Sequence, residues 1–214
     1  MSEAHVITDK AIQDYCDGLS SKPPPFLHTV TDNTRSSVGK TIMLSGQFLG
    51  QYLRMMSMVL KPKNVLEVGT FTGYGSICLL EGLVPEGKIV TIEKDPIHAD
   101  IAEKHFSQMG LKNIDMQVGD AAAILDGSQE KWDLVFIDAA KRQYIKYYEK
   151  ILPHVNIGGV ILADNVLWKG NVVSQEMDKL GQGLHAFNVH VYNDDRVENM
   201  ILPIDDGLHF IIKK

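Results

Sequence analysis

The amino-acid sequence predicts an α/β fold, with a mostly parallel sheet covered by helices on both faces and an antiparallel hairpin at the C-terminus. From residue 64 onward, short apolar runs alternate with amphipathic segments, which is the pattern of strands and helices in a parallel sheet. Two of these runs, at residues 133–139 and 158–165, carry an aspartate near their ends. The last two β-rich runs are separated by a short segment that contains Asp205 and Asp206, which favours a hairpin.

The composition indicates one globular domain over residues 1–214. The chain is 44% hydrophobic and 22% charged, and its net charge of −6 argues against free DNA as a partner. Cys16 and Cys78 stand far apart and outside any zinc-ligand spacing, so a reducing cytoplasm fits best. The chain shows no basic and apolar leader, and no apolar run approaches ~18 residues. We therefore expect neither export nor a membrane span.

The N-terminal part is predicted to be helical. Apolar residues recur at helical spacing over residues 6–19, and three prolines at residues 23–25 then prevent the helix from continuing. Residues 1–25 are therefore interpreted as a helical arm followed by a proline linker. A second apolar stripe over residues 42–56 predicts another helix, which ends at Lys61 and Pro62.

The elements of the sheet are expected to follow in order. Strands are predicted at residues 64–69, 88–93, 114–120, 133–139 and 158–165, with helices between them that include residues 96–110 and a segment ending at 151. The runs at residues 197–204 and 207–214 add the antiparallel edge. Ligands of such sheets bind beyond the carboxyl ends of the strands, near the point where the strand order reverses. Asp138 and Asp164 are predicted to lie there.

A glycine-rich loop, LEVGTFTGYGS at residues 66–76, joins the first strand to a helix. Its GxxxGxG spacing differs from the dinucleotide fingerprint, and the Lys-Ser/Thr pair of a P-loop is missing. Such a turn can also be only a tight connection between a strand and a helix. Glu67 sharpens the interpretation, because a carboxylate there repels a pyrophosphate but suits a cationic ligand. S-adenosylmethionine carries a sulfonium and an ammonium group.

Acidic residues also follow the next two strands. Glu93 lies 20 residues after Gly73, where a carboxylate can accept hydrogen bonds from both ribose hydroxyls. Asp120, followed by Ala121, ends the third strand, where a carboxylate can accept from an adenine amino group. Each acid alone is more often a solvated loop residue. Three of them at successive strand ends favour a shared ligand site.

The ends of the two later strands offer a different chemistry. Asp138, Asp164 and Asn165 provide only oxygen ligands, which suit Mg²⁺, Mn²⁺ or Ca²⁺ rather than zinc. The alternative is that Asp164 caps a helix and Asn165 serves a turn. Lys141 is expected over the same opening, where a nearby cation and desolvation would lower its pKa and make it a base. The alternative interpretation is that Lys141 is an ordinary surface lysine.

Five segments occur in a characteristic order: GQFL, LEVGTFTGY, DLVFIDA.K, GGVI..DN.LW.G.VV and LP..DGL. From about Thr41 to the C-terminus, the chain resembles the cation-dependent class I O-methyltransferases, the family that includes caffeoyl-CoA and catechol O-methyltransferases. The resemblance implies a seven-stranded Rossmann-like methyltransferase sheet and S-adenosylmethionine as the methyl donor. It also implies a divalent cation, with Mg²⁺ ahead of Mn²⁺ and Ca²⁺, and a homodimer.

Carried over position by position, the resemblance assigns roles to single residues. Lys141 matches the catalytic lysine of the family, and Asp138, Asp164 and Asn165 match its metal ligands. The expected cofactor contacts are Thr41, Met43, Glu67, Gly69, Thr70, Ser76, Glu93, Asp120, Ala121 and Asp138.

Three positions depart from the family pattern. The common DADK is here DAAK, so Ala140 lacks a carboxylate often used near the cofactor. Gly75 stands where a serine is usual, which raises the question whether neighbouring Ser76 takes over its contact. Lys169 stands where plant relatives have asparagine, which puts a plant-type substrate contact in doubt.

The predicted reaction is in-line transfer of the sulfonium methyl to one hydroxyl of a catechol-like small molecule, with Lys141 taking the proton. One alternative acceptor is 5-hydroxyuridine in tRNA, because DAAK with the following Tyr144 also resembles bacterial enzymes that methylate it. A second alternative is a cofactor-binding module without turnover. Selectivity is expected on the N-terminal arm, residues 168–183 and the hairpin turn at Asp205 and Asp206.

Overall fold

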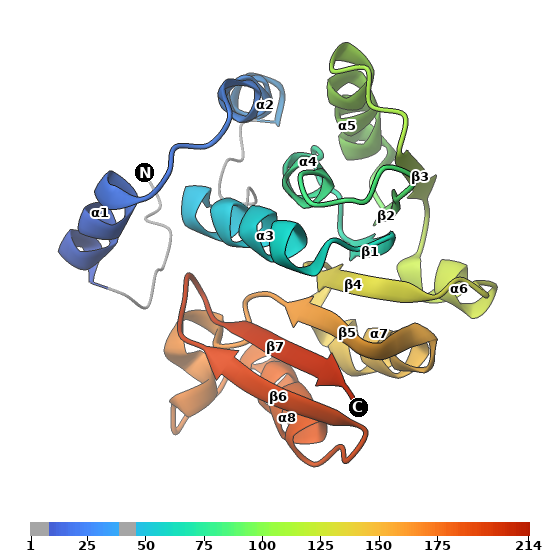
Figure 1. Ribbon diagram of the computed structural model, residues 1–214. Helices are drawn as coiled ribbons and strands as arrows, with labels where there is room; N and C mark the ends of the chain where they lie inside the picture. The colour runs from blue at the N-terminus through green and yellow to red at the C-terminus, as the bar shows by residue number, and fades with distance from the viewer. Residues whose placement is uncertain (1–8, 39–45) are drawn as a thin grey trace.

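The computed structural model describes residues 9–38 and 46–214, whose strands form one central seven-stranded sheet (Figure 1). The strands are β1 (Asn64–Val68), β2 (Lys88–Glu93), β3 (Ile114–Val118), β4 (Trp132–Ile137), β5 (Val155–Ala163), β6 (Val197–Leu202) and β7 (Leu208–Lys213). Their order is β3-β2-β1-β4-β5-β7-β6. The first five pair in parallel, while β7 pairs antiparallel with both β5 and β6. The predicted α/β sheet with its antiparallel hairpin is confirmed, and β6 forms the edge.

Helices cover both faces of this sheet. One face carries α2 (Pro25–Val38), α3 (Gln47–Leu60), α4 (Tyr74–Leu80) and α5 (Pro96–Gln108), and the other carries α6 (Ala121–Asp126), α7 (Tyr144–Ile151) and α8 (Lys179–Tyr192). In the described residues, no helix is long and apolar enough to cross a membrane.

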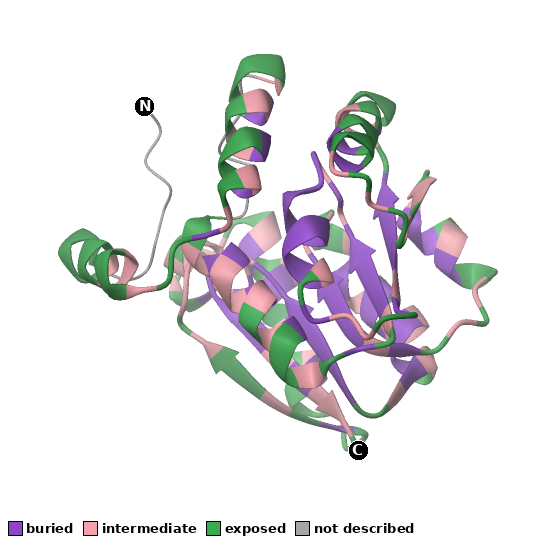
Figure 2. Ribbon diagram, turned by 45° about the horizontal axis from the view of Figure 1, so that its top comes forward, coloured by how far each residue is buried: buried purple, intermediate pink, exposed green. Residues whose placement is uncertain are grey.

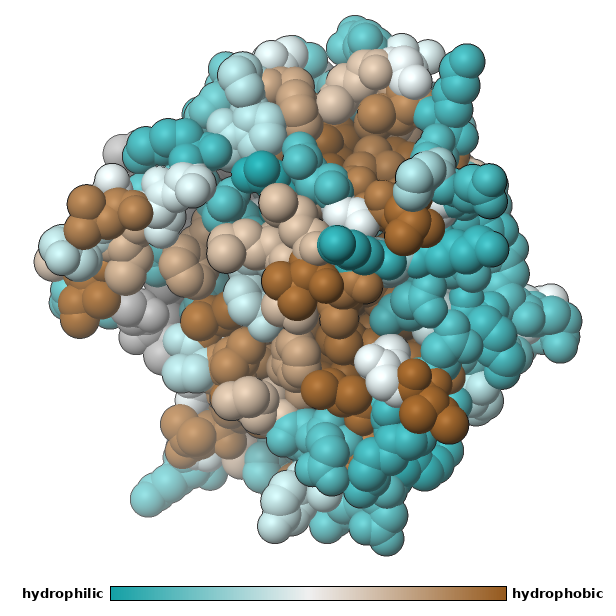
Figure 3. Space-filling model, viewed as in Figure 1, coloured by the Kyte–Doolittle hydropathy of each residue, from teal (hydrophilic) through white to brown (hydrophobic). Residues whose placement is uncertain are grey.

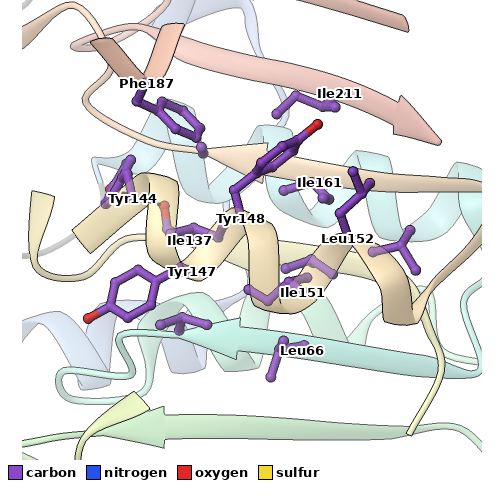
Figure 4. Close-up of a cluster of buried hydrophobic side chains, with 14 of the residues drawn as sticks. Leu66, Ile137, Tyr144, Tyr147, Tyr148, Ile151, Leu152, Ile161, Phe187 and Ile211 are labelled. Atoms are coloured by element: carbon purple, nitrogen blue, oxygen red, sulfur yellow. Dashed lines mark hydrogen bonds between the residues drawn. The ribbon is translucent and has the colours of Figure 1, made fainter. Parts of the chain in front are cut away.

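The parallel strands β1, β2, β4 and β5 each contribute to two apolar layers, because successive side chains of a strand point to opposite faces. In β1, Val65 belongs to the layer that contains Leu53 of α3, while Leu66 belongs to the layer that contains Tyr148 of α7 and Phe187 of α8 (Figure 4). These central strands are accordingly the most buried part of the molecule (Figure 2). Each fully buried large apolar side chain contributes roughly 1.5–3 kcal/mol, so these layers hold the strand ends in fixed positions.

The N-terminal helix α1 (Lys10–Leu19) lies apart from these layers (Figure 1). The Asp9 carboxylate caps it by accepting from the Ala11 N–H at 2.8 Å. None of its residues is buried, and Ile12, Tyr15 and Leu19 are exposed. Figure 3 shows brown, hydrophobic atoms at its left edge, where α1 lies. The predicted helix over residues 6–19 is thus seen from residue 10 onward, and residues 6–8 lie outside the described part.

The second helix, α2, was not predicted from the sequence. Pro25 is its first residue, a position where the missing N–H of proline costs nothing. Its buried side chains are Leu27, Val30 and Thr34, which follow a helical spacing. The next predicted helix, over residues 42–56, corresponds to α3. This helix ends before Lys61 as expected, and residues 42–45 lie outside the described part.

Candidate active site

A cavity of about 650 Å³ opens at the carboxyl ends of the parallel strands. The strand order reverses between β1 and β4, so this is the place where such sheets bind ligands. The predicted site residues that line it are Glu67, Gly69, Thr70, Glu93, Asp120, Ala121, Asp138, Lys141, Asp164 and Asn165. Thr41 and Met43 lie outside the described residues. The topology therefore brings the two groups of predicted residues, cofactor and metal, into one cavity.

Glu67 is the next-to-last residue of β1, and its buried carboxylate belongs to a residue that is only 1% exposed. Its Oε2 accepts hydrogen bonds from the hydroxyls of Ser76 and Thr91, the latter at 2.5 Å. The Thr70 hydroxyl lies 2.6 Å from that of Thr91 and extends the chain of hydroxyls. Burial raises the pKa of Glu67 to about 8, and the charge of Asp138 adds to this effect. The carboxylate is thus held in place but lacks a cationic partner among the described residues.

Ser76 was predicted as a cofactor contact, and the structure places it elsewhere. It is fully buried and is not among the residues that line the cavity. Its hydroxyl supports Glu67 from behind, so any effect on a ligand passes through that carboxylate. Gly75 makes room for the same group, because a Cβ on Gly75 would collide with Glu67 Oε1. The glycine that replaces the usual serine at position 75 therefore leaves the space that the Glu67 carboxylate occupies.

The glycine-rich loop is shaped by two further constraints. Gly69 has φ +103°, and a Cβ there would collide with the carbonyl oxygen of Asp138. Phe71 has φ +51°, which is uncommon for a residue with a side chain, and its N–H donates to Glu93 Oε2 at 2.7 Å. Glu93 Oε1 also accepts from the Asp95 N–H at 2.8 Å. Glu93 therefore orders the loop as well as lining the cavity.

Asp120 both caps a helix and lines the cavity. Its carboxylate caps α6 by accepting from the Ala123 N–H at 3.2 Å, and the residue also lines the cavity together with Ala121. The cavity wall beside it includes Tyr147 and His98, to which the sequence analysis gave no role. The ring of His98 packs edge-on against Phe71, with centroids 4.7 Å apart.

Lys141 lies directly over the end of β4. Its Nζ donates to Asp138 Oδ1 at 2.5 Å and to the Tyr144 hydroxyl at 3.0 Å. The Tyr144 hydroxyl in turn donates to the Asp164 carbonyl oxygen at 2.9 Å, so this buried tyrosine connects the ends of β4 and β5. Sequence reasoning gave Tyr144 no role in the site. Tyr144 entered the sequence analysis only through the resemblance to tRNA-methylating enzymes, and its position three residues after Lys141 was the signal for a role in the site.

The pKa of Lys141 differs from the sequence-based expectation of a lowered value. Burial lowers the pKa of this ammonium, but the negative charges of Asp138 and Asp164 and the hydrogen bond to Asp138 outweigh burial and raise the pKa above its usual range. The expectation assumed a cation beside the lysine. In the arrangement described here, Lys141 itself neutralises Asp138.

The oxygen ligands fit a hard cation in their chemistry. In residues 9–38 and 46–214, no three His, Cys, Asp or Glu side chains form a metal-binding group; the predicted set has two carboxylates and one amide. Asp164 is 3% exposed, and its carboxylate accepts from the Asn165 N–H at 2.7 Å. Burial raises the pKa of Asp164 well above its usual range, and the charge of Asp138 adds to this. A divalent cation would supply the positive charge that this buried carboxylate lacks.

A protein-family model described as O-methyltransferase matches residues 17–214. The chain belongs to the O-methyltransferase family. It is 31% identical over 180 residues to caffeoyl-CoA O-methyltransferase 1 of Eucalyptus globulus, which covers 78% of this chain and 73% of the relative. It is 33% identical over 161 residues to catechol O-methyltransferase of Niastella koreensis, with 72% and 73% covered.

A solved structure supports the same assignment for this O-methyltransferase. The SAH-bound methyltransferase of Podospora anserina matches with a TM-score of 0.89 and 26% identity, over 95% of this chain and 94% of that chain. The predicted family, the Rossmann-like methyltransferase fold and the enzyme class are confirmed. The roles of single site residues, the cation, the homodimer and the cytoplasmic location stay predictions.

Proposed function

We propose that this O-methyltransferase moves the methyl group of S-adenosylmethionine to one hydroxyl of a catechol-like small molecule, with a divalent cation at the site. One observation carries the proposal. Asp138, Asp164 and Lys141 meet at one end of the cavity that Glu67 and Glu93 line further along. A relative that is 33% identical is named a catechol O-methyltransferase, which supports the choice of acceptor.

The donor is assigned to the β1–β2 end of the cavity. Glu67 would face the cationic methionine end, since its buried carboxylate has two hydroxyl donors and no cationic partner in the described chain. Glu93 would accept from the ribose hydroxyls, and its own position is fixed by two backbone N–H groups. Asp120 would face the adenine. This orientation places the methyl group toward β4.

The cation is assigned to Asp138, Asp164 and Asn165. Asn165 has φ +57°, a conformation that asparagine tolerates better than most residues and that fixes where its side chain starts. A bound divalent cation would lower the pKa of an acceptor hydroxyl and orient adjacent oxygens. Two neighbouring hydroxyls on a ring match this requirement, which is why a catechol fits better than an isolated alcohol.

A divalent cation on Asp138 and Asp164 would offset the negative charges that raise the pKa of Lys141, and the neutral amine would then take the proton of the reacting hydroxyl. The Nζ of Lys141 is held on two sides, by Asp138 and by the Tyr144 hydroxyl, so its position at the end of β4 is well defined. Positioning of the two reactants is the other contribution of the chain. Holding the oxygen and the methyl carbon in line at ~3 Å can supply ~7 kcal/mol or more of the barrier reduction.

The proposal is tested by methyl transfer from labelled S-adenosylmethionine to a panel of catechols and, in parallel, to undermodified bulk tRNA, each with Mg²⁺ and with EDTA. We expect chelator-sensitive labelling of a catechol. Labelling of tRNA alone would move the function to RNA modification. Cofactor binding without labelling of either acceptor would favour a non-catalytic module.

The role of Lys141 is tested by Lys141→Met, with Lys146→Met as the matched control. Lys146 is exposed on α7 and does not line the cavity. We expect Lys141→Met to lower kcat by about 10²–10⁴-fold, the usual effect of losing a general base, while Lys146→Met keeps its activity. Equal kcat in the two variants would remove Lys141 from the reaction.

A further inference from the structure

One end of the cavity, the hairpin end, is formed by residues that the donor and the cation leave unused. It consists of Trp168, Lys169, Asp205 and Asp206, which line the same cavity as the predicted metal ligands. The first two follow β5, and the two aspartates lie in the turn between β6 and β7. Because β7 pairs antiparallel with β5, this turn lies beside the carboxyl end of β5. An acceptor whose hydroxyl reacts near Lys141 would extend toward the hairpin end.

The two aspartates of the turn differ in their surroundings. Asp206 is 7% exposed, its Oδ1 accepts from the Lys169 N–H at 2.5 Å, and its carbonyl oxygen accepts from the Leu167 N–H at 3.0 Å. It therefore ties the turn to the segment after β5. This is a structural role, and it leaves Asp206 poorly suited to contact a ligand.

Asp205 has no such role. It is half-buried, lines the cavity and has φ +52°, so a side chain is kept at a position that favours glycine. Within residues 9–38 and 46–214, no hydrogen bond or ion pair engages its carboxylate. Its Oδ2 lies 3.4 Å from the place of a Cβ on Gly46, just before α3. A carboxylate in a cavity without a donor is available to a ligand.

The charges around Asp205 favour a cation. Burial raises the pKa of Asp205, and the negative charges of Asp206, Asp138 and Asp17 in α1 add to this effect. Lys169 is the cation of the hairpin end, but it is exposed, and its Nζ lies 5.9 Å from the centre of the Trp168 ring. An exposed ammonium is screened by water, so it offsets little of the negative charge.

We propose, as an extension of the proposed function, that Asp205 selects acceptors whose catechol ring carries a protonated amine. The amine would donate to the Asp205 carboxylate while the ring hydroxyls face Lys141 and the proposed cation ligands. A carboxylate substituent at this place would meet repulsion from both aspartates of the turn.

The test compares three catechols of similar size: dopamine, neutral 4-ethylcatechol and 3,4-dihydroxyphenylacetate. Each is methylated by the wild type, by Asp205→Asn and by the control Asp195→Asn, which removes the same charge from an exposed residue outside this cavity. Asparagine tolerates positive φ, so Asp205→Asn keeps the turn. The readout is kcat/KM for each acceptor at neutral pH, with thermal unfolding of each protein as the check on folding.

We expect the wild type and Asp195→Asn to rank the amine above the neutral ring and the neutral ring above the carboxylate. The span, which is the ratio of kcat/KM for dopamine to kcat/KM for 3,4-dihydroxyphenylacetate, should be at least about tenfold, as for other charge-based discrimination. Asp205→Asn should reduce that span to about threefold or less, mainly through KM, with 4-ethylcatechol little changed. These results would support the proposal.

Three results would overturn it. An unchanged span in Asp205→Asn would show that this carboxylate does not contact the substituent, while leaving the proposed function intact. A variant with an unchanged span that needs more Mg²⁺ for the same rate would place Asp205 with the cation instead. If the wild type methylates no catechol, the proposed function fails and this inference fails with it. Failure of the inference alone is distinguished from this, because the wild type then still methylates catechols.

Discussion

Replacing Glu67 by glutamine should change stability and cofactor affinity in opposite directions. The substitution keeps the shape of a side chain that is 1% exposed and removes only its charge. The Ser76 and Thr91 hydroxyls that donate to Glu67 can donate to the amide oxygen instead. The change therefore separates the charge of Glu67 from its packing.

The stability effect depends on pH, and its sign follows from the raised pKa. Burial raises the pKa of Glu67 from 4.5 to about 8, so the folded protein binds this proton more tightly than the unfolded chain does. The contribution of protonated Glu67 to the free energy of unfolding is fully present below pH 4.5 and is lost as the pH rises through 8. At 1.36 kcal/mol per unit, this group costs the wild type about 3 kcal/mol between pH 5 and pH 8. Glu67→Gln should not show this loss.

The binding effect has the opposite sign. A cationic ligand gains from the ionised carboxylate, so Glu67→Gln should bind S-adenosylmethionine about 10–100-fold more weakly, the range expected for losing one partly buried charge pair. At neutral pH, ligand binding to the wild type should also release a proton from Glu67. Calorimetry in two buffers with different ionisation enthalpies measures this release, and urea unfolding at pH 5 and pH 8 measures the stability.

The control is Glu103→Gln, which removes an exposed charge from α5. It should follow the wild type in both measurements. If Glu67→Gln and the wild type lose the same stability between pH 5 and pH 8, the carboxylate is not the group that titrates. Unchanged affinity and the same proton release in the variant would show that Glu67 does not face the cationic part of the donor.

Three further predictions use single contacts. Gly69→Ala should lower the unfolding free energy by about 1–3 kcal/mol, because its φ is +103° and a Cβ collides with the backbone at the end of β4; thermal unfolding measures this. Gly75→Ser should weaken S-adenosylmethionine binding, measured by calorimetry, because the new side chain displaces the Glu67 carboxylate, and a variant with unchanged affinity would contradict this. Burial lowers the pKa of His209 from 6.5 to about 4, so its stabilisation is present above pH 6.5 and about 2 kcal/mol of it is lost by pH 5. Urea unfolding of His209→Gln should lack that loss, while His185→Gln, at an exposed position of α8, should keep it.

Most of the fold could be predicted because the apolar runs of a buried parallel sheet are short, continuous and separated by clear turns. The helix α2 was missed for a related reason. It buries only Leu27, Val30 and Thr34, one of them polar, and it directly follows a run of prolines. Pro25 was interpreted as the end of a linker, although proline is also common as the first residue of a helix.

The meeting of Asp138 and Asp164 could be predicted because adjacent parallel strands end at the same edge of the sheet. Ile137 of β4 pairs with Ala163 of β5, so the residues that follow them are neighbours. The nearness of Asp205 could not be predicted in this way. It depends on β7 pairing with β5 rather than lying outside β6, which is a choice between two antiparallel arrangements that the local pattern does not decide.

The charges of the cavity constrain what it can hold. Glu67 lies in β1, Asp164 follows β5 and Asp205 lies in the turn between β6 and β7, and burial raises the pKa of each. A fold that keeps three such carboxylates loses stability to their burial, and packing elsewhere must offset that loss. Lys141 forms its ion pair with Asp138, and its charge offsets only part of the rise in the pKa of Asp164. The remaining negative charge favours cationic occupants, and the proposed donor, divalent cation and amine-bearing acceptor would each bring positive charge to a different carboxylate. An acceptor with several negative charges would have to overcome the same field, which weighs against tRNA unless the cation and donor bind first.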